Sequence, residues 1–341
     1  MDQNRKKQLI WQVPFLLLLI IGTILIIRQQ QDTPYKTAHG LIFGTSYKLT
    51  YEADAELQKE IEESLKEVDS ALSMFNEQSV ISRINRENGG EANEMFMEVF
   101  NKAMEISKET NGAFDITVAP LVNAWGFGFK SGETPTRHQV DSILHFVGWN
   151  KVWAEGNTIK KKDRRVMLDC SAIAKGYGVD IVARLLKSKG IKNFMIEIGG
   201  EIVISGISPK RVPWKIGVIK PNDDSLSIDN EYQTCLNVTD KAMATSGNYR
   251  RFYYKGGKRY AHTIDPKTGY PVQHNILSAT VLANDCATAD AYATSFMVMG
   301  LEKAKAILEK HPELMAYIIY NDDNNKSGVW YSPSLKNKIE K

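Results

Sequence analysis

The chain has 341 residues, of which 43% are hydrophobic and 24% are charged, and its formal net charge is +3 at pH 7. This length accommodates one large domain or two ordinary ones with a sizeable core. The small net charge, and the lack of any Lys/Arg cluster interleaved with aromatic residues, argue against a nucleic-acid partner. The three cysteines show no CxxC spacing, which argues against a disulfide framework and against a zinc site.

The N-terminus contains an apolar stretch from Leu9 to Ile27. As a helix rising about 1.5 Å per residue, it just suffices to cross a hydrocarbon core of roughly 30 Å. Basic residues at positions 5–7 precede it and only Arg28 follows closely, so the positive-inside rule places the N-terminus in the cytoplasm. A cleaved signal peptide is the alternative, but no small-x-small cleavage site follows. We therefore expect a cytoplasmic segment (1–8), an uncleaved single-pass anchor (9–27) and a linker (28–40).

Residues 41–341 are expected to form one catalytic unit, because no linker-like change in composition divides them. Hydrophobic periodicity predicts helices over residues 54–70, 95–110, 137–147, 173–189, 285–300 and 301–310. Strands are predicted over residues 41–51, 194–207, 214–219, 251–260, 316–320 and 329–331, with a hairpin inside 152–168. Helices and strands alternate without the regular βαβ rhythm of a doubly wound sheet. We therefore expect an α+β fold with a mixed or antiparallel sheet and flanking helices.

A polar loop with a titratable side chain follows the strand expected over 251–260. It reads His262-Thr-Ile-Asp265-Pro-Lys-Thr-Gly269, in which the Asp-Pro pair and the glycine indicate a turn. Further along, Asp290 and Thr294 are spaced so that a helix presents both on one face. Oxygen ligands of this kind suit a hard cation such as Mg²⁺. A candidate base and a candidate metal site so close in sequence indicate phosphate chemistry.

Each of these residues also has a structural interpretation. A single histidine such as His262 is more often a packing or surface residue than a catalytic one. A carboxylate such as Asp290, in an otherwise apolar helix, must be paired, hydrogen-bonded or metal-bound. Cys170 and Cys286 lie beside two of the motifs, where a thiol nucleophile is the alternative to the far commoner buried packing cysteine.

Three further segments combine binding chemistry with an equally simple structural role. Residues 169–178 (DCSAIAKGYG) join a strand to a helix, where an Asp or Ser caps the helix and where a helix N-terminus attracts phosphate. The spacing is not that of a P-loop. Residues 111–128 place Asp115 between aromatics, a pattern that suits a planar heterocycle or an aromatic core cluster. In residues 74–85, Arg83 suits a phosphate or a surface ion pair.

Taken together and in this order, the motifs resemble those of the ApbE-type FAD:protein FMN transferases, also called flavin transferases. The resemblance covers nearly all of residues 41–341. The motifs that carry it are Phe43-Gly-Thr45, the Ser-x-x-Ser-Arg-x-Asn run ending at Asn85, Gly112-Ala-Phe-Asp115, Asp169-x-Ser-x-x-Ala-Lys-Gly-Tyr177, Ile198-Gly-Gly-Glu201, Thr245-Ser-Gly247, His262-x-Ile-Asp-Pro-x-Thr-Gly269 and Asp290-x-x-x-Thr294.

The resemblance implies an enzyme that splits FAD at its pyrophosphate, releases AMP and joins FMN through a phosphoester to a Thr (or Ser) side chain of a target flavoprotein. It implies FAD contacts at Phe43, Phe75, Ala113, Phe114, Asp115, Asp169, Lys175 and Ile264. It implies a Mg²⁺ site at Ala172, Asp290, Ala293 and Thr294, whose oxygen ligands would also accept Mn²⁺. The two alanines offer only backbone oxygens. Phe75 stands where the family commonly has Tyr or Trp, so it keeps the ring plane without a hydroxyl.

The implied chemistry agrees with the residues. Mg²⁺ would neutralise the pyrophosphate and orient it for in-line attack. A threonine hydroxyl is a poor nucleophile and needs a base, for which His262, with an ordinary pKa of about 6.5, is the candidate.

The expected partners are flavoprotein subunits of membrane electron-transfer complexes. The anchor would hold the catalytic domain near them, on the extracytoplasmic side of the cytoplasmic membrane. The alternatives are a Mg²⁺-dependent FAD pyrophosphatase that yields FMN and AMP, and a non-catalytic flavin-binding protein.

Overall fold

The structure is a computed structural model that describes most of the chain. The described residues are 13–23, 33–128, 134–221, 231–248, 252–255, 258–273, 275–322 and 326–340. Residues 13–23 are helical, and most of their large apolar side chains are exposed. Within the ranges that the structure describes, no helix combines the length and apolar character that crossing a bilayer requires. Residues 9–12 and 24–27 of the expected anchor lie outside those ranges.

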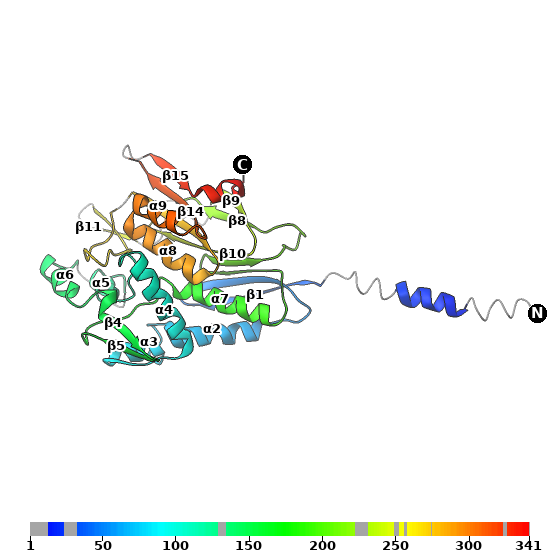
Figure 1. Cartoon of the computed structure of the whole chain (residues 1–341), viewed down its shortest axis with the longest axis horizontal. Coiled ribbons are helices and arrows are strands. Elements are labelled where there is room, and N and C mark those ends of the chain that lie inside the picture. Colours follow the sequence, from blue (N-terminus) through cyan, green and yellow to red (C-terminus); the bar gives the residue numbers. More distant parts are fainter. Residues whose placement is uncertain are drawn as a thin grey trace, which may run out of the picture.

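An eight-stranded sheet organises the rest of the chain (Figure 1). Its strand order is β1-β2-β6-β7-β10-β13-β14-β15, and all neighbouring strands are antiparallel. The strands are β1 (Tyr35–Ile42), β2 (Thr45–Glu52), β6 (Phe194–Ile198), β7 (Glu201–Ser205), β10 (Lys241–Gly247), β13 (Ile276–Ala283), β14 (Met315–Asn321) and β15 (Ser327–Tyr331). The expected α+β fold is confirmed, and the large sheet is antiparallel rather than mixed.

Three smaller sheets complete the described β-structure. They are β3 (Gly89–Glu91) with β5 (Thr158–Lys161) and β4 (Val152–Glu155), β8 (Lys215–Ile219) with β9 (Tyr232–Asn237), and β11 (Phe252–Lys255) with β12 (Lys258–Ala261). The hairpin predicted inside 152–168 is β4–β5, which turns at Gly156 with a φ of 59°. The strand predicted over 251–260 is two paired strands in the residues that are described.

The six helices predicted from the hydrophobic periodicity are confirmed, and two short helices, Val80–Arg86 and Ala119–Ala124, were not predicted. They are α2 (Gln58–Leu72), α3 (Val80–Arg86), α4 (Glu94–Glu109), α5 (Ala119–Ala124), α6 (Arg137–Leu144), α7 (Ala174–Ser188), α8 (Cys286–Met299) and α9 (Leu301–Lys310), with short 3₁₀ turns η1 (Trp149–Lys151) and η2 (Pro333–Lys338). Side-chain caps set several starts. The Asn93 side chain accepts from the Phe96 N–H at the start of α4, and Thr136 with Gln139 forms a capping box at α6.

Two predicted strands are hairpins instead. The strand expected over 41–51 turns at Phe43 and Gly44, whose φ values are 52° and 72°. The strand expected over 194–207 turns at Gly199 and Gly200, with φ of 62° and 104°. Glycine adopts these left-handed conformations without strain, so the two Gly-containing motifs are the turns themselves.

The linker expected over residues 28–40 is too long. Tyr35–Ile42 is strand β1, which pairs along its whole length with β2. The domain therefore begins before residue 41, because β1 gains its hydrogen bonds only as the edge of the large sheet. Residues 28–32 of the expected linker lie outside the described ranges.

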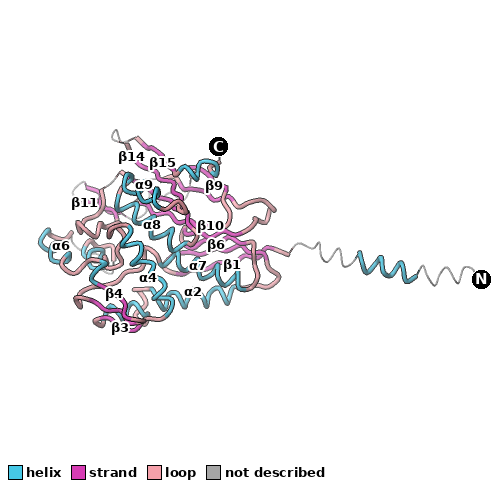
Figure 2. Tube along the Cα trace, in the orientation of Figure 1, coloured by secondary structure: helices cyan, strands magenta, loops and turns pink. Residues whose placement is uncertain are grey.

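Helices cover one face of the large sheet and a hairpin covers the other. α2, α4, α7 and α8 gather on one face, as Figure 2 shows, around buried residues such as Leu49, Leu65 and Phe296. On the other face, β8, β9 and η2 bury a second apolar layer that includes Ile204 and Leu236. Since successive strand residues point to opposite faces, each central strand contributes side chains to both apolar layers. α8 is buried on nearly every side, so polar residues within it carry a high desolvation cost.

Candidate active site

The candidate site is built on the close approach of α7 and α8. The backbone N–H of Gly176, in the first turn of α7, donates to Oδ2 of Asp290 in α8 at 3.2 Å. A side chain at position 176 would place its Cβ 2.4 Å from the carbonyl oxygen of Cys286. Glycine is therefore required for the two helices to pack this closely. Two motifs that are distant in sequence thus meet inside the fold.

A buried ion pair lies beside this contact. Nζ of Lys175 lies 2.5 Å from Oε1 of Glu201, the first residue of β7. Glu201 is only 2% exposed, and its Oε2 has no hydrogen-bond partner among the described residues. A buried carboxylate oxygen left without a donor is costly, so this atom is suited to a cation or to a donor on a ligand.

The charges of this cluster perturb one another. Burial raises the pKa of Glu201 to about 7; the nearby charge of Asp290 acts in the same direction and Lys175 opposes it. Burial also raises the pKa of Asp290, against the opposing effect of Lys175. Burial by itself would lower the pKa of Lys175, but the two carboxylates outweigh it and raise that pKa. Clusters of groups whose pKa values are perturbed in this way are typical of functional sites.

The donors present fit a hard divalent cation. Asp290 supplies a carboxylate, and the Thr294 hydroxyl lies one turn further along the same helix, 3.1 Å from Oγ of Ser246. Ala293, which is fully buried, and Ala172 carry only methyl side chains, so each offers only a backbone oxygen. Across the described residues, no group of three or more His, Cys, Asp or Glu side chains is placed to hold a metal by itself. Hydroxyl, carbonyl and substrate oxygens would have to complete such a site, as is usual for Mg²⁺.

Two of the three rings predicted to contact FAD lie towards the N-terminal end of α7. Phe43 packs against Gly178, where an added Cβ would lie 2.6 Å from its ring. Glu60 and Lys189 pair at 3.3 Å between the start of α2 and the end of α7, so the two helices are antiparallel. Phe75, just beyond α2, is therefore on the side of the α7 N-terminus, and it is 70% exposed. A ring exposed to this extent presents an apolar surface to the solvent.

The side chains of residues 113–115 have mainly structural roles. Phe114 and Ala113 are buried in the main core. Asp115 accepts from the N–H and hydroxyl of Thr117 at 2.8 and 2.7 Å, and from the Trp149 N–H at 2.8 Å. Burial raises the pKa of Asp115, while these hydrogen bonds lower it. Of the two interpretations of this segment, an aromatic core cluster with an Asp turn describes its side chains.

Asp169 closes a turn instead of capping α7. Its Oδ1 accepts from the Ser171 N–H at 2.7 Å, and its own N–H donates to the carbonyl of Ile116 at 2.7 Å. The N-cap position of α7 is Ile173, whose side chain makes no capping bond. The amide of Asn85 binds both the N–H and the carbonyl of Leu168, which fixes the approach to this turn. Burial raises the pKa of Asp169.

The loop of His262 is held by backbone contacts. Ile264 forms an isolated bridge with Pro271, and the carbonyl of Asp265 accepts from the Gly269 N–H at 2.8 Å. Nε1 of Trp125 donates to the Gly269 carbonyl at 2.7 Å. The Asp265 carboxylate accepts from residues of its own turn, so it is a turn residue. The imidazole of His262 is half-buried.

This loop is joined to the candidate metal residues through β10. The hydroxyl of Thr263, next to His262, donates to Oδ1 of Asn248 at 2.7 Å. Asn248 directly follows β10, and Ser246 in that strand touches Thr294. Two hydrogen bonds, Thr263 to Asn248 and Ser246 to Thr294, therefore connect the His262 loop to α8 through β10. Phe127 meets the His262 ring edge-on, with centroids 6.5 Å apart.

A family model for the ApbE family matches residues 43–319. The chain belongs to the ApbE family. The resemblance carried by the order of the motifs is thereby confirmed, and the residues that meet between α7 and α8 all lie within the matched range.

Proteins named as flavin transferases are similar to this chain over most of their length. The FAD:protein FMN transferase of Vibrio cholerae serotype O1 is 38% identical over 323 residues, covering 91% of this chain and 95% of that protein. The Haemophilus influenzae enzyme of the same name is 36% identical, covering 86% and 89%. The solved flavin transferase ApbE of Vibrio cholerae has a TM-score of 0.80 at 36% identity, covering 89% of this chain and 100% of that one. The apo flavinyl transferase ApbE of Pseudomonas stutzeri has a TM-score of 0.81 at 26% identity, covering 91% and 98%.

Glu201 and Ser246 belong to ApbE motifs of this chain, but sequence reasoning assigned them no role. The signal for Glu201 was a charged residue directly after a Gly-Gly turn and before the apolar residues of β7. Its pairing with Lys175 depends on where the turn places the start of β7, which no spacing rule specifies.

Three other candidates have structural roles. Cys170 and Cys286 are buried free thiols whose pKa burial raises, so neither is a reactive nucleophile. The Arg83 guanidinium donates to the carbonyl of Glu91 at 2.6 Å, on the strand that follows its helix. Neither a phosphate nor an ion pair is needed to explain that arginine.

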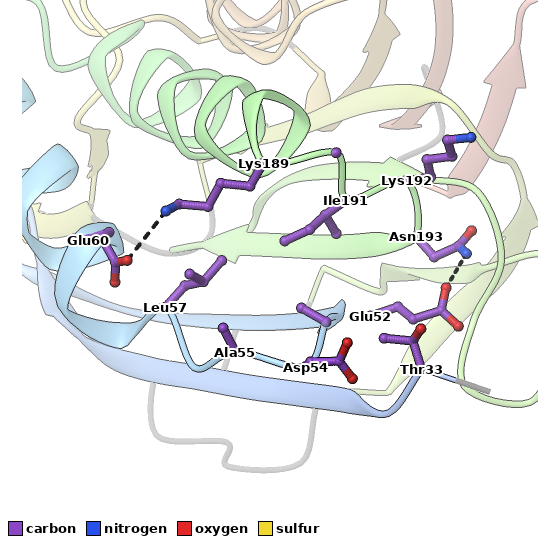
Figure 3. A pocket seen from close by; sticks show the side chains of 12 residues that line it. Thr33, Glu52, Asp54, Ala55, Leu57, Glu60, Lys189, Ile191, Lys192 and Asn193 are labelled. Atoms are coloured by element: carbon purple, nitrogen blue, oxygen red, sulfur yellow. Dashed lines mark hydrogen bonds and ion pairs between the residues drawn. The ribbon is translucent and has the colours of Figure 1, made fainter. Parts of the chain in front are cut away.

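A cavity of about 520 Å³ lies at the far end of α7, away from this site (Figure 3). It is lined by residues that include Glu52, Glu60, Lys189 and Asn193, several of which already pair with one another. None of the residues predicted for catalysis, FAD or metal lines it. The motif residues that the structure brings together, Lys175, Gly176 and Asp290, lie instead at the N-terminal end of α7.

Proposed function

We propose that this protein transfers FMN from FAD to a threonine or serine side chain of a partner flavoprotein, with AMP as the leaving group and Mg²⁺ as the metal. The observation that carries the proposal is the meeting of Lys175, Glu201 and Asp290 between α7 and α8. Relatives named FAD:protein FMN transferase, similar over nearly the whole chain, support the same activity.

The chain's own residues suit each part of this reaction. Asp290 and Thr294 would hold the metal, which supplies charge neutralisation at the pyrophosphate when bound. Lys175, kept cationic by its carboxylate neighbours, binds a phosphate oxygen. The acceptor hydroxyl attacks the phosphorus of the FMN half and loses its proton to the imidazole of His262. The bond from that phosphorus to the AMP oxygen breaks, and AMP leaves with the electron pair.

The flavin itself requires an apolar surface. The exposed ring of Phe75 and the packed ring of Phe43 supply one beside the α7 N-terminus. We place FAD so that its pyrophosphate meets Lys175 and its ring system meets these aromatics. Ile264, Asp169 and the backbone of residues 113–115 would border it.

We further propose that residues 9–27 anchor the protein in the cytoplasmic membrane, with the catalytic domain on the extracytoplasmic side. The apolar stretch and the basic residues before it support this orientation. Tethering would raise the effective concentration of the enzyme near flavoprotein subunits of membrane electron-transfer complexes.

The test is mass spectrometry of a candidate acceptor domain incubated with the full chain, FAD and Mg²⁺. We expect the acceptor to gain one FMN on a threonine or serine, and EDTA to prevent it. Free FMN and AMP with every tested acceptor unmodified would instead indicate an FAD pyrophosphatase. FAD left intact under all conditions would indicate a flavin-binding protein and contradict both activities.

A further inference from the structure

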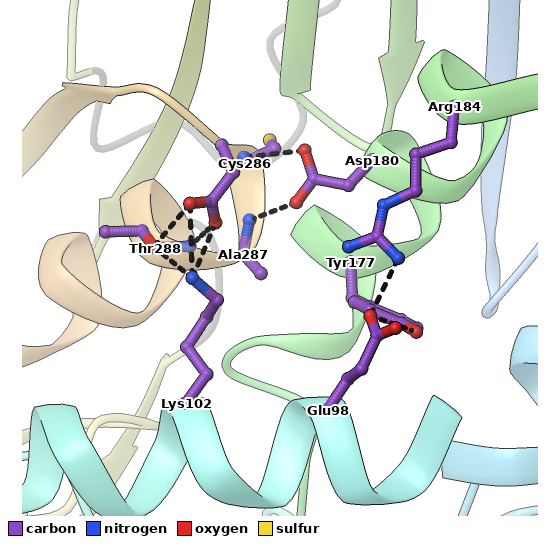
Figure 4. A network of polar contacts seen from close by, with 9 residues as sticks. Glu98, Lys102, Tyr177, Asp180, Arg184, Cys286, Ala287 and Thr288 are labelled. Atoms are coloured by element: carbon purple, nitrogen blue, oxygen red, sulfur yellow. Dashed lines mark hydrogen bonds and ion pairs between the residues drawn. The ribbon is translucent and has the colours of Figure 1, made fainter. Parts of the chain in front are cut away.

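Two carboxylates from different helices hold the start of α8 (Figure 4). Asp285 is the N-cap, and its Oδ1 accepts from the Thr288 N–H at 2.9 Å. Asp180, from the middle of α7, accepts from the N–H of Cys286 at 2.8 Å and from that of Ala287 at 2.9 Å, one with each oxygen. The first N–H groups of a helix have no partner inside the helix, and negative charge near them is favourable.

The residues of the Asp180 contact lie on the same faces of α7 and α8 as the residues of the candidate site. Asp180 follows Gly176 by one helical turn, and Asp290 follows Cys286 by one turn. Residues one turn apart lie on the same face. α7 is therefore joined to α8 twice along one seam, at Asp180 and again where the Gly176 N–H meets Asp290. A shift of α8 at its start would move Asp290 away from Gly176 and Lys175.

We infer that Asp180 is a positioning residue whose ionised carboxylate sets α8 against α7 and so places Asp290 and Thr294 for the metal. Protonation of Asp180 removes charge and one acceptor from the start of α8, which weakens metal binding. The inference rests on the proposed function in one respect, namely that Asp290 and Thr294 are the metal residues.

The electrostatic surroundings of Asp180 place its titration near neutral pH. Burial raises the pKa of Asp180 to about 7; the charge of Asp285 adds to the increase, while the two N–H groups and Arg184 lower the pKa. The Cys286 thiol faces the same region but stays neutral, because burial raises its pKa well above the ordinary value. Asp180 is thus charged above about pH 7 and neutral below it.

The other charged groups around this seam are already paired. From α4, Nζ of Lys102 binds Asp285 at 3.1 Å and the Thr288 hydroxyl at 2.8 Å. Glu98, also on α4, binds Arg184 at 2.7 Å and the Tyr177 hydroxyl at 2.9 Å. Glu98 therefore ties α4 to α7 within the same network (Figure 4), and neither of these two bonds is to α8, which makes it a matched control.

The experiment is Mn²⁺ binding to the full chain in detergent without FAD, followed by electron paramagnetic resonance at pH 6 and pH 8. For Asp180→Asn we expect affinity to fall about tenfold at pH 8, the lower end of the usual cost of losing a residue that supports a metal ligand. At pH 6 the two proteins should agree within about twofold, because wild-type Asp180 is then mostly neutral. Glu98→Gln should bind as the wild type does at both values.

Equal affinities of wild type and a folded Asp180→Asn at pH 8 would overturn the inference. If that variant does not fold, Arg184→Gln provides the test, because losing a charge that lowers the pKa of Asp180 should move the pH dependence of Mn²⁺ affinity upward; an unmoved profile also overturns it. Mn²⁺ binding without FMN transfer would contradict the proposed function while leaving the comparison at Asp180 intact. A wild-type chain that binds no Mn²⁺ overturns both.

Discussion

Lys175 and Glu201 form a 2.5 Å ion pair in which one carboxylate oxygen is engaged and the other has no hydrogen-bond partner among the described residues. Lys175 lies in the first turn of α7 and Glu201 is the first residue of β7, so the pair joins the helix layer to the turn end of the large sheet. A buried pair of this kind gives little net stability, since the desolvation of two charges opposes their attraction. The pair instead places the ammonium group of Lys175 near Asp290.

Replacing Glu201 by Gln should therefore impair function more than folding. The amide cannot hold Lys175 by charge, and it adds a donor where the site requires an acceptor. We expect FMN transfer to fall by about tenfold or more, in line with 1.5–3 kcal/mol for a charged hydrogen bond. Steady-state transfer kinetics with thermal melting measure both effects. The matched control is Glu302→Gln, which breaks the exposed pair with Lys305 and should change neither; a normal rate in Glu201→Gln would rule out its role.

Asp290→Asn should reduce activity without reducing stability. Burial raises the pKa of this carboxyl, so removing its charge relieves a desolvation cost. We expect an unchanged or higher melting temperature without metal, together with a loss of Mg²⁺-dependent transfer of at least about a hundredfold. FAD binding, followed by flavin fluorescence, should persist. Retention of wild-type transfer in this variant would contradict the metal assignment.

His262→Gln tests the proposed base. General-base catalysis is worth about 10²–10⁴-fold, so transfer should slow by a factor in that range while FAD affinity stays the same. His138, exposed in α6, supplies the control His138→Gln, for which we expect full activity. If transfer by His262→Gln stays within threefold of wild type across pH 6–9, a different group accepts the proton.

Gly176→Ala tests the close approach of α7 and α8. The added Cβ would lie 2.4 Å from a backbone oxygen that cannot move aside without shifting α8. We expect a loss of about 1–3 kcal/mol in the free energy of unfolding, measured by urea denaturation, and weaker Mn²⁺ binding in the fraction that folds. Ser188→Ala, an exposed change in the last turn of the same helix, should leave both quantities unchanged.

Stability should decrease with rising pH in the range where Asp180 titrates. Its pKa is raised from the model-compound value of 3.8 to about 7, so the folded protein holds a proton that the unfolded chain releases in between. This group's contribution to the free energy of unfolding is therefore fully present below about pH 4. It is lost as pH rises through 7, by up to about 4 kcal/mol. The melting temperature of Asp180→Asn should vary less between pH 5 and pH 8 than that of wild type; parallel curves would disagree with the assignment.

Six of the described helices were predictable from the sequence because an amphipathic helix records its buried face locally, whereas the short helices α3 and α5 were not predicted. Leu65 and Val68 of α2 alternate with charged residues at helical spacing, and both are buried as expected. The chain turns at Phe43-Gly44 and Gly199-Gly200 were missed as turns, since the flanking residues are strand-like on both sides and only the positive φ values reveal the reversal. The start of β1 was missed because its pairing partner, and not its own composition, makes it a strand.

The candidate site, like the fold, was predictable from the sequence only in part. The sequence by itself determined the family, the approximate helices and the residue types for phosphate and metal chemistry, because motif order and periodicity are properties of the chain. Only the tertiary structure decided that Glu201 pairs with Lys175, that Asp115 and Phe114 serve the core, and that Asp180 holds the start of α8. The physical reason is that hydrogen bonding and desolvation depend on which groups meet after folding. Gly176 of α7 and Asp290 of α8, which are 114 residues apart in the sequence, meet only when the antiparallel sheet has set the positions of the two helices.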